Sequence, residues 1–378
     1  MTNILVAPDS FKGSLSAPEA AEAIAQGVSR ACPGCQVTML PIADGGEGTL
    51  DALLSGAGGR CLTQAVRGPL GEEVEARLGV LPGGVAIVEM AQASGLTLIA
   101  PDRRNPLLAS SYGTGQLIRA ALDQNCRQLV ITIGGTATVD GGIGLLTALG
   151  ARFIDTGGQE LPPIGSSLPR IAAVDLSLLD PRLESCSIRV ASDVTNPLCG
   201  PNGAAAVFGP QKGATAEMVN YLDGGLRRLA EVTAKATGQD VTELSGAGAA
   251  GGVGAALVAY LGGQMQSGVQ VVLDTLQADS YLRLADLVIT GEGRMDGQTA
   301  HGKAPVGVAL RARRYGCRTI ALVGSLLPGY EAVYGQGISA VFPIINQPLT
   351  LGEAMSRAAE LLSDAAARAM HAWQAFRE

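Results

Sequence analysis

The sequence predicts an α/β fold with two lobes, on the basis of its length, its composition and a recurring pattern. The chain has 378 residues, more than one ordinary domain contains, so each of two lobes would have enough chain to bury a core. Hydrophobic residues make up 47% and charged residues 16%, which is typical of a compact, well-buried protein. A short Val/Ile/Leu run, a Gly-rich loop and an Ala-rich helical pattern recur, as expected of buried parallel strands joined by helices.

The apolar runs predict the individual strands. The first run, residues 4–7, leads to Ser16-Ala17-Pro18-Glu19, a capping box with an early proline that predicts the start of a helix. Further strands are predicted at residues 37–41, 129–133, 188–191, 287–290 and 319–323. Open parallel sheets bind ligands beyond the carboxyl ends of their strands, so we expect the site in the loops that follow these runs.

The pattern changes between residues 62 and 90. Short β-rich runs are broken there by Gly68-Pro69 and Pro82-Gly83-Gly84, which predict the hairpins of a second lobe. The last strands and a helix over residues 351–376 are expected to pack back on the N-terminal unit. We therefore predict a discontinuous, Rossmann-like, mainly parallel three-layer α/β/α domain and a mixed α/β domain, with the active site in the cleft between them. The predicted ranges are 1–65 with 285–378, and 66–284.

Charge and targeting signals exclude several classes of partner. The net charge is -7 without a basic block, which argues against nucleic acid, and no Lys/Arg-rich amphipathic helix suggests a membrane surface. The first residues lack the basic segment of a signal peptide, and no apolar run reaches the length of a membrane span. We expect a cytoplasmic protein with small-molecule partners.

The seven cysteines are expected to be reduced in that compartment. Only Cys32-Pro33-Gly34-Cys35 has motif spacing. It could be a redox pair, but it lies between a helix pattern and a strand without a second pair for zinc, so an inert turn is the favoured interpretation.

Two glycine motifs match familiar nucleotide-binding patterns only weakly. Residues 246–251 satisfy GxGxxG, but residues 240–245 do not read as the strand that a dinucleotide fold requires, and close helix packing explains the glycines at least as well. Residues 297–304 nearly match the P-loop, yet Ala304 has no hydroxyl for Mg²⁺ and the predicted strand ends well before Gly297. We expect Lys303 to bind phosphate through a different geometry.

Lysines and acids gather in the predicted loops. The four lysines are Lys12, Lys212, Lys235 and Lys303, and three of them adjoin a glycine. Any one can be an exposed turn residue, but three ammonium groups beside flexible backbone donors suit phosphate or carboxylate. Seven acids lie at or just after predicted strand ends: Asp9, Asp44, Glu47, Asp140, Asp193, Glu292 and Asp296.

A single acid in such a loop is most often a helix cap or a loop hydrogen-bond acceptor, which suits Glu47 and Asp140. Together, however, these loops contain every part that phosphoryl transfer needs: carboxylates for a metal, cations and backbone donors for phosphates, and an acid for the attacking hydroxyl. With His301 and His371 as the only histidines, a histidine-based triad has at most one candidate, and no Cys/His set has zinc spacing.

Longer segments resemble the bacterial glycerate kinases along nearly the whole chain. The matching segments are residues 7–14, 41–49, 133–142, 192–198 with 200–203, 208–213, and 290–299 through 302–305. The resemblance implies ATP-dependent phosphorylation of D-glycerate to 2-phosphoglycerate with Mg²⁺, by a two-lobed enzyme that is a monomer or homodimer. A local departure lies at Gly297 with Ala300-His301.

Roles for individual residues follow as hypotheses. Asp193 would accept or orient the proton of the attacking hydroxyl, and Arg294 would clamp the substrate carboxylate in a bidentate way. The residues expected to be catalytic are Asp193, Lys12 and Asp44, and those expected to bind the substrate are Ser10, Arg294, Asp296 and Asp9. The nucleotide would be bound by Lys212, Lys303, Gly134, Gly135 and Thr136, and the metal by Asp44 and Glu292.

Other activities stay open at this point. A kinase of another short sugar acid would use the same loops, because pocket length is invisible in the sequence. A dinucleotide-dependent dehydrogenase would bind nicotinamide through residues 246–251, and a ligand-binding regulator on the same sheet would form no ADP. Side-chain identity also does not separate attack by the 2-hydroxyl from attack by the 3-hydroxyl.

Overall fold

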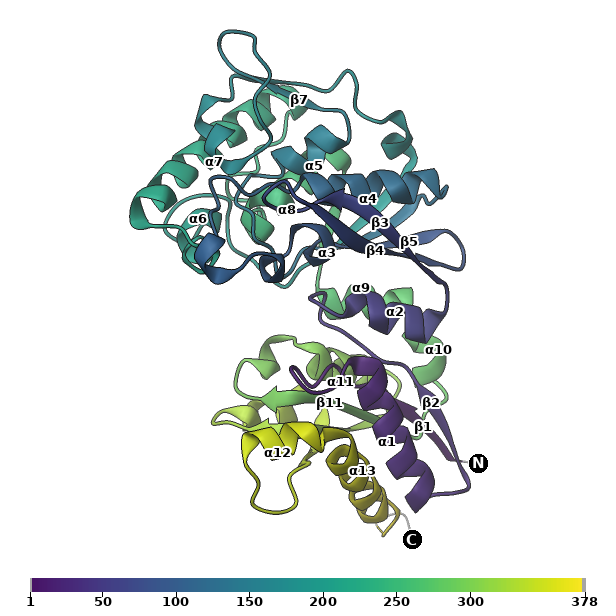
Figure 1. Ribbon diagram of the computed structural model, residues 1–378. Coiled ribbons are helices and arrows are strands. Elements are labelled where there is room, and N and C mark those ends of the chain that lie inside the picture. Colours follow the sequence, from purple (N-terminus) through teal and green to yellow (C-terminus); the bar gives the residue numbers. More distant parts are fainter. Residues whose placement is uncertain (1, 376–378) are drawn as a thin grey trace. The chain divides into compact units, whose positions relative to one another are not determined.

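The computed structural model describes residues 2–375 (Figure 1). The chain divides into two compact units. Unit 1 contains the segments before Gly45, from 51 to 58 and after 266, and unit 2 contains residues 45–50 and 59–266. The backbone therefore passes from one unit to the other at 44/45, 50/51, 58/59 and 266/267. The division at 65/66 and 284/285 stays a prediction about the folding domains.

Unit 1 is built on a five-stranded parallel sheet with the order β13-β12-β11-β1-β2. Alternate residues of β12 face opposite sides: Ile320 and Leu322 pack with helices α1 and α13, whereas Ala321 and Val323 pack with α11. Helices thus cover both faces. The bounds are β1 Thr2–Val6, β2 Cys35–Met39, β11 Leu287–Met295, β12 Arg318–Leu326, β13 Ile338–Pro343, α1 Ala17–Ala31, α11 Ala304–Arg313 and α13 Ala358–Ala375.

The helices of unit 1 begin where local signals predict. Ser16 caps α1 in a capping box with Glu19. The predicted C-terminal helix is two helices, α12 and α13, and Phe376 lies outside the described residues. Helix α13 packs on α1, where a Cβ at Gly27 would lie 2.0 Å from the carbonyl oxygen of Ser363, so the close approach requires glycine. Further helices are α2 Thr49–Ala57, which spans the 50/51 crossing, α9 Gly268–Thr275, α10 Ala278–Leu282 and α12 Leu351–Ser356.

Unit 2 contains a six-stranded mixed sheet with the order β10-β9-β6-β5-β4-β3. The hairpins predicted between residues 62 and 90 are confirmed, because β3, β4 and β5 pair antiparallel, whereas β5, β6, β9 and β10 run parallel. The bounds are β3 Arg60–Arg67, β4 Glu73–Leu81, β5 Val85–Glu89, β6 Gln128–Thr132, β9 Ser187–Ala191 and β10 Gln264–Gln266. Together the two sheets confirm the α/β class.

The helices of unit 2 are α3 Ala91–Ser94, α4 Tyr112–Asp123, α5 Ile143–Ala148, α6 Ala204–Phe208, α7 Ala216–Thr237 and α8 Val253–Leu261, and a small antiparallel pair joins β7 Arg152–Ile154 to β8 Ala173–Asp175. Within residues 2–375, none of the helices of either unit combines the length and apolar character needed to cross a bilayer.

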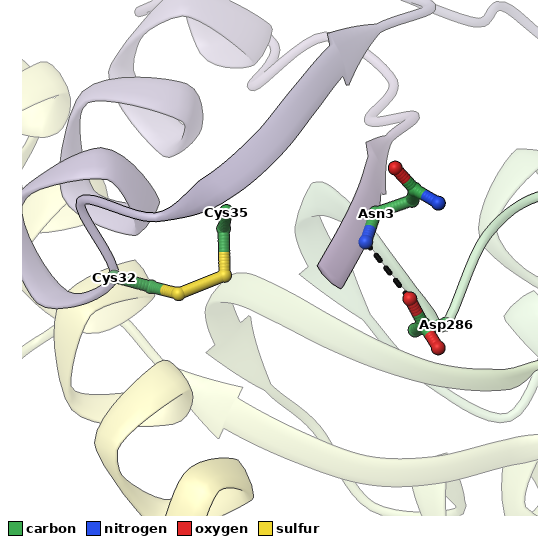
Figure 2. The surroundings of a disulfide bond; sticks show 4 residues. All are labelled: Asn3, Cys32, Cys35 and Asp286. Atoms are coloured by element: carbon green, nitrogen blue, oxygen red, sulfur yellow. Dashed lines mark hydrogen bonds between the residues drawn. A yellow bond between two sulfur atoms is a disulfide. The ribbon is translucent and has the colours of Figure 1, made fainter. Parts of the chain in front are cut away.

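A disulfide joins Cys32 to Cys35, with the two Cα atoms 5.4 Å apart (Figure 2). Cys32 is the C-cap of α1 and Cys35 begins β2, so the bond closes the tight connection between these elements. The expectation that every cysteine is reduced is wrong for this pair, and the interpretation of the segment as an inert turn misses the covalent link. The thiols of Cys61, Cys126, Cys186, Cys199 and Cys317 are free.

Removing this link should lower the stability of the protein moderately. For a closed loop of this length, the chain-entropy model gives about 2 kcal/mol of unfolding free energy. The double variant Cys32→Ser/Cys35→Ser should therefore unfold at lower urea concentration than the oxidised wild type. Cys61→Ser, which changes an exposed thiol, is the control. Equal urea midpoints for the double variant and the wild type would show that the link does not stabilise the protein in solution.

Candidate functional site

Three acids of unit 1 come from neighbouring strands: Asp9 and Asp44 from the segments that follow β1 and β2, and Glu292 from the second half of β11. The chain beyond β1 continues along β11, with the amide of Ala7 donating to Ile289 O (2.8 Å) and that of Asp9 to Gly291 O (2.9 Å). The segment after β2 follows on the other side, where the amide of Ile42 donates to Pro8 O (2.9 Å). Asp9, Asp44 and Glu292 are thereby gathered at one edge of the sheet, where open parallel sheets bind ligands.

Burial and repulsion by neighbouring carboxylates disfavour the charged forms of Asp9 and Glu292. Burial, together with the charges of Asp44 and Glu292, raises the pKa of Asp9 to about 7. Burial also raises the pKa of Glu292 to about 7, although the hydroxyl of Thr299 donates to its Oε1 (2.8 Å) and Lys303 favours the ionised form. The cluster therefore favours a proton or a cation near neutral pH.

The acidic edge fits Mg²⁺ bound partly by phosphates. Among residues 2–375, no group of three His, Cys, Asp or Glu side chains is arranged to hold a metal ion. Phosphotransferase sites bind Mg²⁺ through one or two carboxylates plus phosphate oxygens and waters. Asp44 and Glu292 supply two such carboxylates, and the repulsion that the charges of Asp44 and Glu292 exert on Asp9 is what a bound cation would relieve.

The loop after β1 brings Ser10 and Lys12 to the same edge. Phe11 is buried and anchors the loop, while Lys12 is exposed. A Cβ at Gly293 would lie 3.2 Å from the Lys12 amide nitrogen, so glycine in β11 permits this close approach. The amide of Ser10 donates to Asp9 Oδ1 (2.6 Å). The predicted substrate ligands Asp9 and Ser10 are therefore in direct contact, with Lys12 two residues beyond Ser10.

The end of β11 carries a second charged group. Arg294 Nε lies 3.8 Å from Asp296 Oδ2, and Lys303 Nζ lies 3.7 Å from Asp296 Oδ1. The Arg294 side chain is 65% exposed, so its pairing with Asp296 contributes little stability and leaves most of the guanidinium in contact with solvent. The structure thus brings together Arg294, Asp296 and Lys303, three of the predicted ligands.

Strand β11 is longer than predicted, which changes the interpretation of the near P-loop. The strand continues to Met295 rather than ending at residue 290, because β12 pairs with it as far as Met295↔Leu326. Glu292 and Arg294 are consequently strand residues. Residues 296–303 then connect β11 directly to α11, whose N-cap is Lys303. The expectation that the strand ends well before Gly297 is wrong. The side chain of His301 in this loop lies outside the described part of the chain.

Unit 2 brings together the predicted nucleotide ligands Thr136 and Lys212. The buried amine of Lys212 donates to Thr136 Oγ1 (3.2 Å) and to the carbonyl oxygen of Thr138 (2.7 Å). Burial lowers the pKa of Lys212 to about 7, and the charge of Asp140 acts in the opposite direction. In this arrangement the Lys212 amine supports the loop that follows β6.

The interpretation of Asp140 as a loop acceptor is confirmed. The carboxylate is fully buried and accepts from the amide and hydroxyl of Ser111 (both 2.7 Å), from the Gly142 amide (3.1 Å) and from the Gly144 amide (3.2 Å). Burial nevertheless raises its pKa. These four donors assign Asp140 to the architecture of the loop.

The glycines of residues 246–251 serve close packing. Residues 240–248 form turns and irregular chain rather than a strand. A Cβ at Gly251 would lie 2.1 Å from the carbonyl oxygen of Thr138, and one at Gly248 would lie 2.2 Å from that of Pro197. The strand required by a dinucleotide fold does not precede the motif. The expected close packing is present, but these two glycines pack against loop carbonyls rather than against a helix.

Asp193 and Gly134 lie beyond the ends of adjacent strands. In the parallel pairing, Thr132 at the end of β6 lies opposite Ala191 at the end of β9. Gly134 and Asp193 each follow two positions after these paired residues. Asp193 is exposed, and Gly135 has a positive φ of 69°. The predicted proton acceptor and the Gly134-Gly135-Thr136 turn thus share one edge of the unit 2 sheet.

No role was predicted from the sequence for two residues that the structure places in these loops, Glu89 and Thr299. Glu89 ends β5 and accepts from the amides of Gly48 (3.2 Å) and Leu50 (3.1 Å). The sequence contained a signal for Glu89, since it is an acid directly after the apolar run 85–88, of which residues 86–88 are buried. Thr299, the donor to Glu292, lies in a matching segment but has no local signal for this contact.

Comparison with known proteins identifies the family. A sequence model of the Glycerate kinase family matches residues 4–374. Glycerate kinase from Bacillus subtilis (strain 168) is 49% identical over 360 residues, which cover 95% of this chain and 94% of that protein. Glycerate 2-kinase from Escherichia coli (strain K12) is 48% identical over 352 residues, covering 93% and 92%.

A solved structure agrees over the whole length. The crystal structure of a protein described as glycerate kinase 2 from Salmonella typhimurium LT2 is similar with a TM-score of 0.91 and 46% sequence identity. The similarity covers 100% of this chain and 99% of that one. The acid and lysine loops described above all lie within the matched residues 4–374. The chain therefore belongs to the glycerate kinase family.

Proposed function

We propose that the protein transfers the γ-phosphoryl group of ATP to the 2-hydroxyl of D-glycerate, giving 2-phosphoglycerate, ADP and a proton. The observation that supports this most is the gathering of Asp9, Asp44 and Glu292 in a member of the glycerate kinase family, with the Lys12 backbone close to Gly293 of β11. Phosphoryl transfer requires such charge placement and little covalent chemistry from the protein. We propose that the reaction takes place in the cytoplasm and that the protein is a monomer or homodimer.

Asp44 and Glu292 are proposed to hold Mg²⁺, which when bound supplies neutralising charge on the ATP phosphates. To do so Glu292 must lose its proton, and its pKa of about 7 places that event close to neutral pH. Thr299 holds one oxygen of Glu292 through its hydroxyl (2.8 Å) and so fixes the orientation of the carboxylate.

Substrate recognition is proposed for the loops of unit 1. Arg294 pairs with the substrate carboxylate, because a guanidinium presents two parallel N-H donors. Lys12 and Ser10 bind the carboxylate or the transferring phosphoryl group, and Lys12 lowers the barrier by neutralising developing charge. Asp9 and Asp296 accept hydrogen bonds from substrate hydroxyls.

Proton removal and nucleotide binding are proposed mainly for unit 2. Asp193 takes or orients the proton of the 2-hydroxyl as that oxygen attacks phosphorus. Gly134, Gly135 and Thr136 offer backbone and hydroxyl donors to the nucleotide phosphates, with Lys212 behind them (3.2 Å from Thr136 Oγ1) and Lys303 of unit 1 as a further cation.

A transfer assay tests the function. Purified protein with Mg-ATP and D-glycerate should form ADP, and phosphorus NMR should show 2-phosphoglycerate as the product. Absence of ADP above the glycerate-free control would refute the kinase proposal, and 3-phosphoglycerate would refute the regiochemistry. Four-carbon sugar acids serve as competing substrates, and a higher kcat/KM for one of them would reassign the substrate.

A further inference from the structure

Glu89 is a buried carboxylate that holds a glycine-rich segment in place. It ends β5 and is only 1% exposed. Its Oε1 accepts from the amide of Gly48 (3.2 Å) and its Oε2 from that of Leu50 (3.1 Å), residues far from it in sequence. Burying a carboxylate is costly unless it is hydrogen-bonded, so this pair of contacts fixes where the segment Gly45–Leu50 lies in unit 2.

The same segment abuts the Gly134-Gly135 turn. A Cβ at Gly134 would lie 3.2 Å from the Cα of Gly46 and 3.7 Å from the carbonyl oxygen of Gly45, so the two backbones are almost in contact. Strands β5 and β6 pair side by side, with Glu89 opposite Thr132, and both loops therefore lie at one edge of the sheet. Thr49 adds an internal bond, from its hydroxyl to the carbonyl oxygen of Gly46 (2.7 Å).

Glu89 occupies the donors that an anion would otherwise use at the start of α2. The first amides of a helix are unpaired and attract anions. Here the amides of Gly48 and Leu50 are already bound to the Glu89 carboxylate. The start of α2 is thus filled by a side chain of the protein itself, and Glu89 has the role of an anchor rather than a ligand of substrate.

We propose that Glu89 is a positioning residue for nucleotide binding. By holding Gly45–Leu50, it keeps Gly46 against Gly134 and so fixes the shape of the Gly134-Gly135-Thr136 turn that receives the phosphates. The inference rests on the proposed function in assigning that turn to ATP. A loop held by a rigid partner binds its ligand more tightly, because the ordering cost is met before binding.

Glu89→Gln tests this role. The amide can accept from one backbone N-H but presents its own NH₂ group toward the other, so one contact is lost at nearly constant volume. We expect the Kd of a non-hydrolysable Mg-ATP analogue, measured by calorimetry, and the KM for ATP to rise by about tenfold or more. The KM for glycerate should stay within about twofold, because the Arg294 and Lys12 loops are unchanged. A merely structural residue would lower the folded fraction and leave both KM values unchanged.

Asp155→Asn is the matched control. Asp155 also accepts from two backbone amides, those of Gly157 (2.8 Å) and Gln159 (3.0 Å), but on an exposed turn between β7 and β8. Its nucleotide Kd should stay within about twofold of wild type. If Glu89→Gln does not fold, Glu89→Asp keeps the charge on a shorter side chain. This variant should weaken nucleotide binding and speed hydrogen exchange at the amides of Gly48 and Leu50.

A folded Glu89→Gln protein with wild-type nucleotide affinity would overturn the inference, as would Glu89→Asp with both unchanged exchange and unchanged affinity. Calorimetry needs neither glycerate nor turnover. If the wild type binds the nucleotide analogue but does not phosphorylate glycerate, the proposed function fails while the change in Kd still decides the role of Glu89. If the wild type does not bind the analogue at all, both are refuted.

Discussion

Asp193→Asn should lower kcat for glycerate phosphorylation by about two to four orders of magnitude, the usual contribution of a positioned acid-base group. The change removes the ability to take the hydroxyl proton and preserves the size of the side chain. Asp193 is exposed beyond the end of β9, so the substitution should leave the melting temperature almost unchanged. Steady-state assays at saturating Mg-ATP and glycerate, together with thermal melts, measure the two effects separately.

Asp240→Asn provides the control for Asp193. Asp240 is another exposed loop acid of unit 2, and it accepts from the amide of Thr242 (2.9 Å). Its kcat should remain within about twofold of wild type. Turnover of Asp193→Asn within a few fold of wild type would show that a different group takes the proton. Asp9, whose pKa of about 7 suits a base near neutral pH, would then be the next residue to replace.

Glu292→Gln should stabilise the protein at alkaline pH while it impairs the reaction. In the folded wild type, the Glu292 carboxyl keeps its proton up to about pH 7, whereas in the unfolded chain it ionises near 4.5. Between these values the folded state binds more protons, so the stability of the wild type falls as pH rises. The gap from 4.5 to about 7 corresponds to about 3 kcal/mol at most, fully lost above pH 7.

Glutamine carries no titrating proton, so the variant lacks this loss. Its unfolding free energy should match that of the wild type below about pH 4.5 and exceed it by up to about 3 kcal/mol near pH 8. The amide oxygen still accepts from Thr299, which preserves the local structure. Urea unfolding at several pH values measures the difference. Equal curves for the two proteins across this range would contradict the raised pKa.

Glu292→Gln should also change the Mg²⁺ requirement of the reaction, because it removes the negative charge of Glu292. Wild-type enzyme should require less Mg²⁺ for half-maximal rate as pH rises through 7, because Glu292 becomes ionised and can bind the cation. Glu292→Gln should need more Mg²⁺ at every pH and lose most of this dependence. Glu22→Gln, a change of an exposed acid on α1 of the same unit, should alter neither stability nor the Mg²⁺ requirement.

The strands and helices were largely predictable because their signals are local. The apolar runs at 4–7, 129–133 and 188–191 agree with β1, β6 and β9 to within two residues at either end. Ser16 and Glu19 marked the start of α1 through a capping box that depends on four consecutive residues. The end of β11 was missed because Gly291 and Gly293 read as loop residues, whereas pairing with a separate strand, β12, extends the element to Met295.

The candidate site was predictable as a set of residues but not as an arrangement. Asp9, Asp44 and Glu292 followed from the rule that ligands bind at the carboxyl ends of parallel strands, and these three acids are indeed gathered. The raised pKa values of Asp9 and Glu292 depend on burial, which no local pattern reports. The contact of the Lys212 amine with Thr136 joins residues 76 positions apart.

By itself, the sequence determined the α/β class, the succession of most strands and helices, the family and the chemical types at the site. Those properties depend on side-chain periodicity, capping residues and long motifs, all of which are written along the chain. Only the tertiary structure decided the length of β11, the inward direction of the Lys212 amine and the anchoring of residues 45–50 by Glu89. Each of these arises from contacts between distant segments, whose free energies depend on packing and desolvation rather than on neighbouring residues.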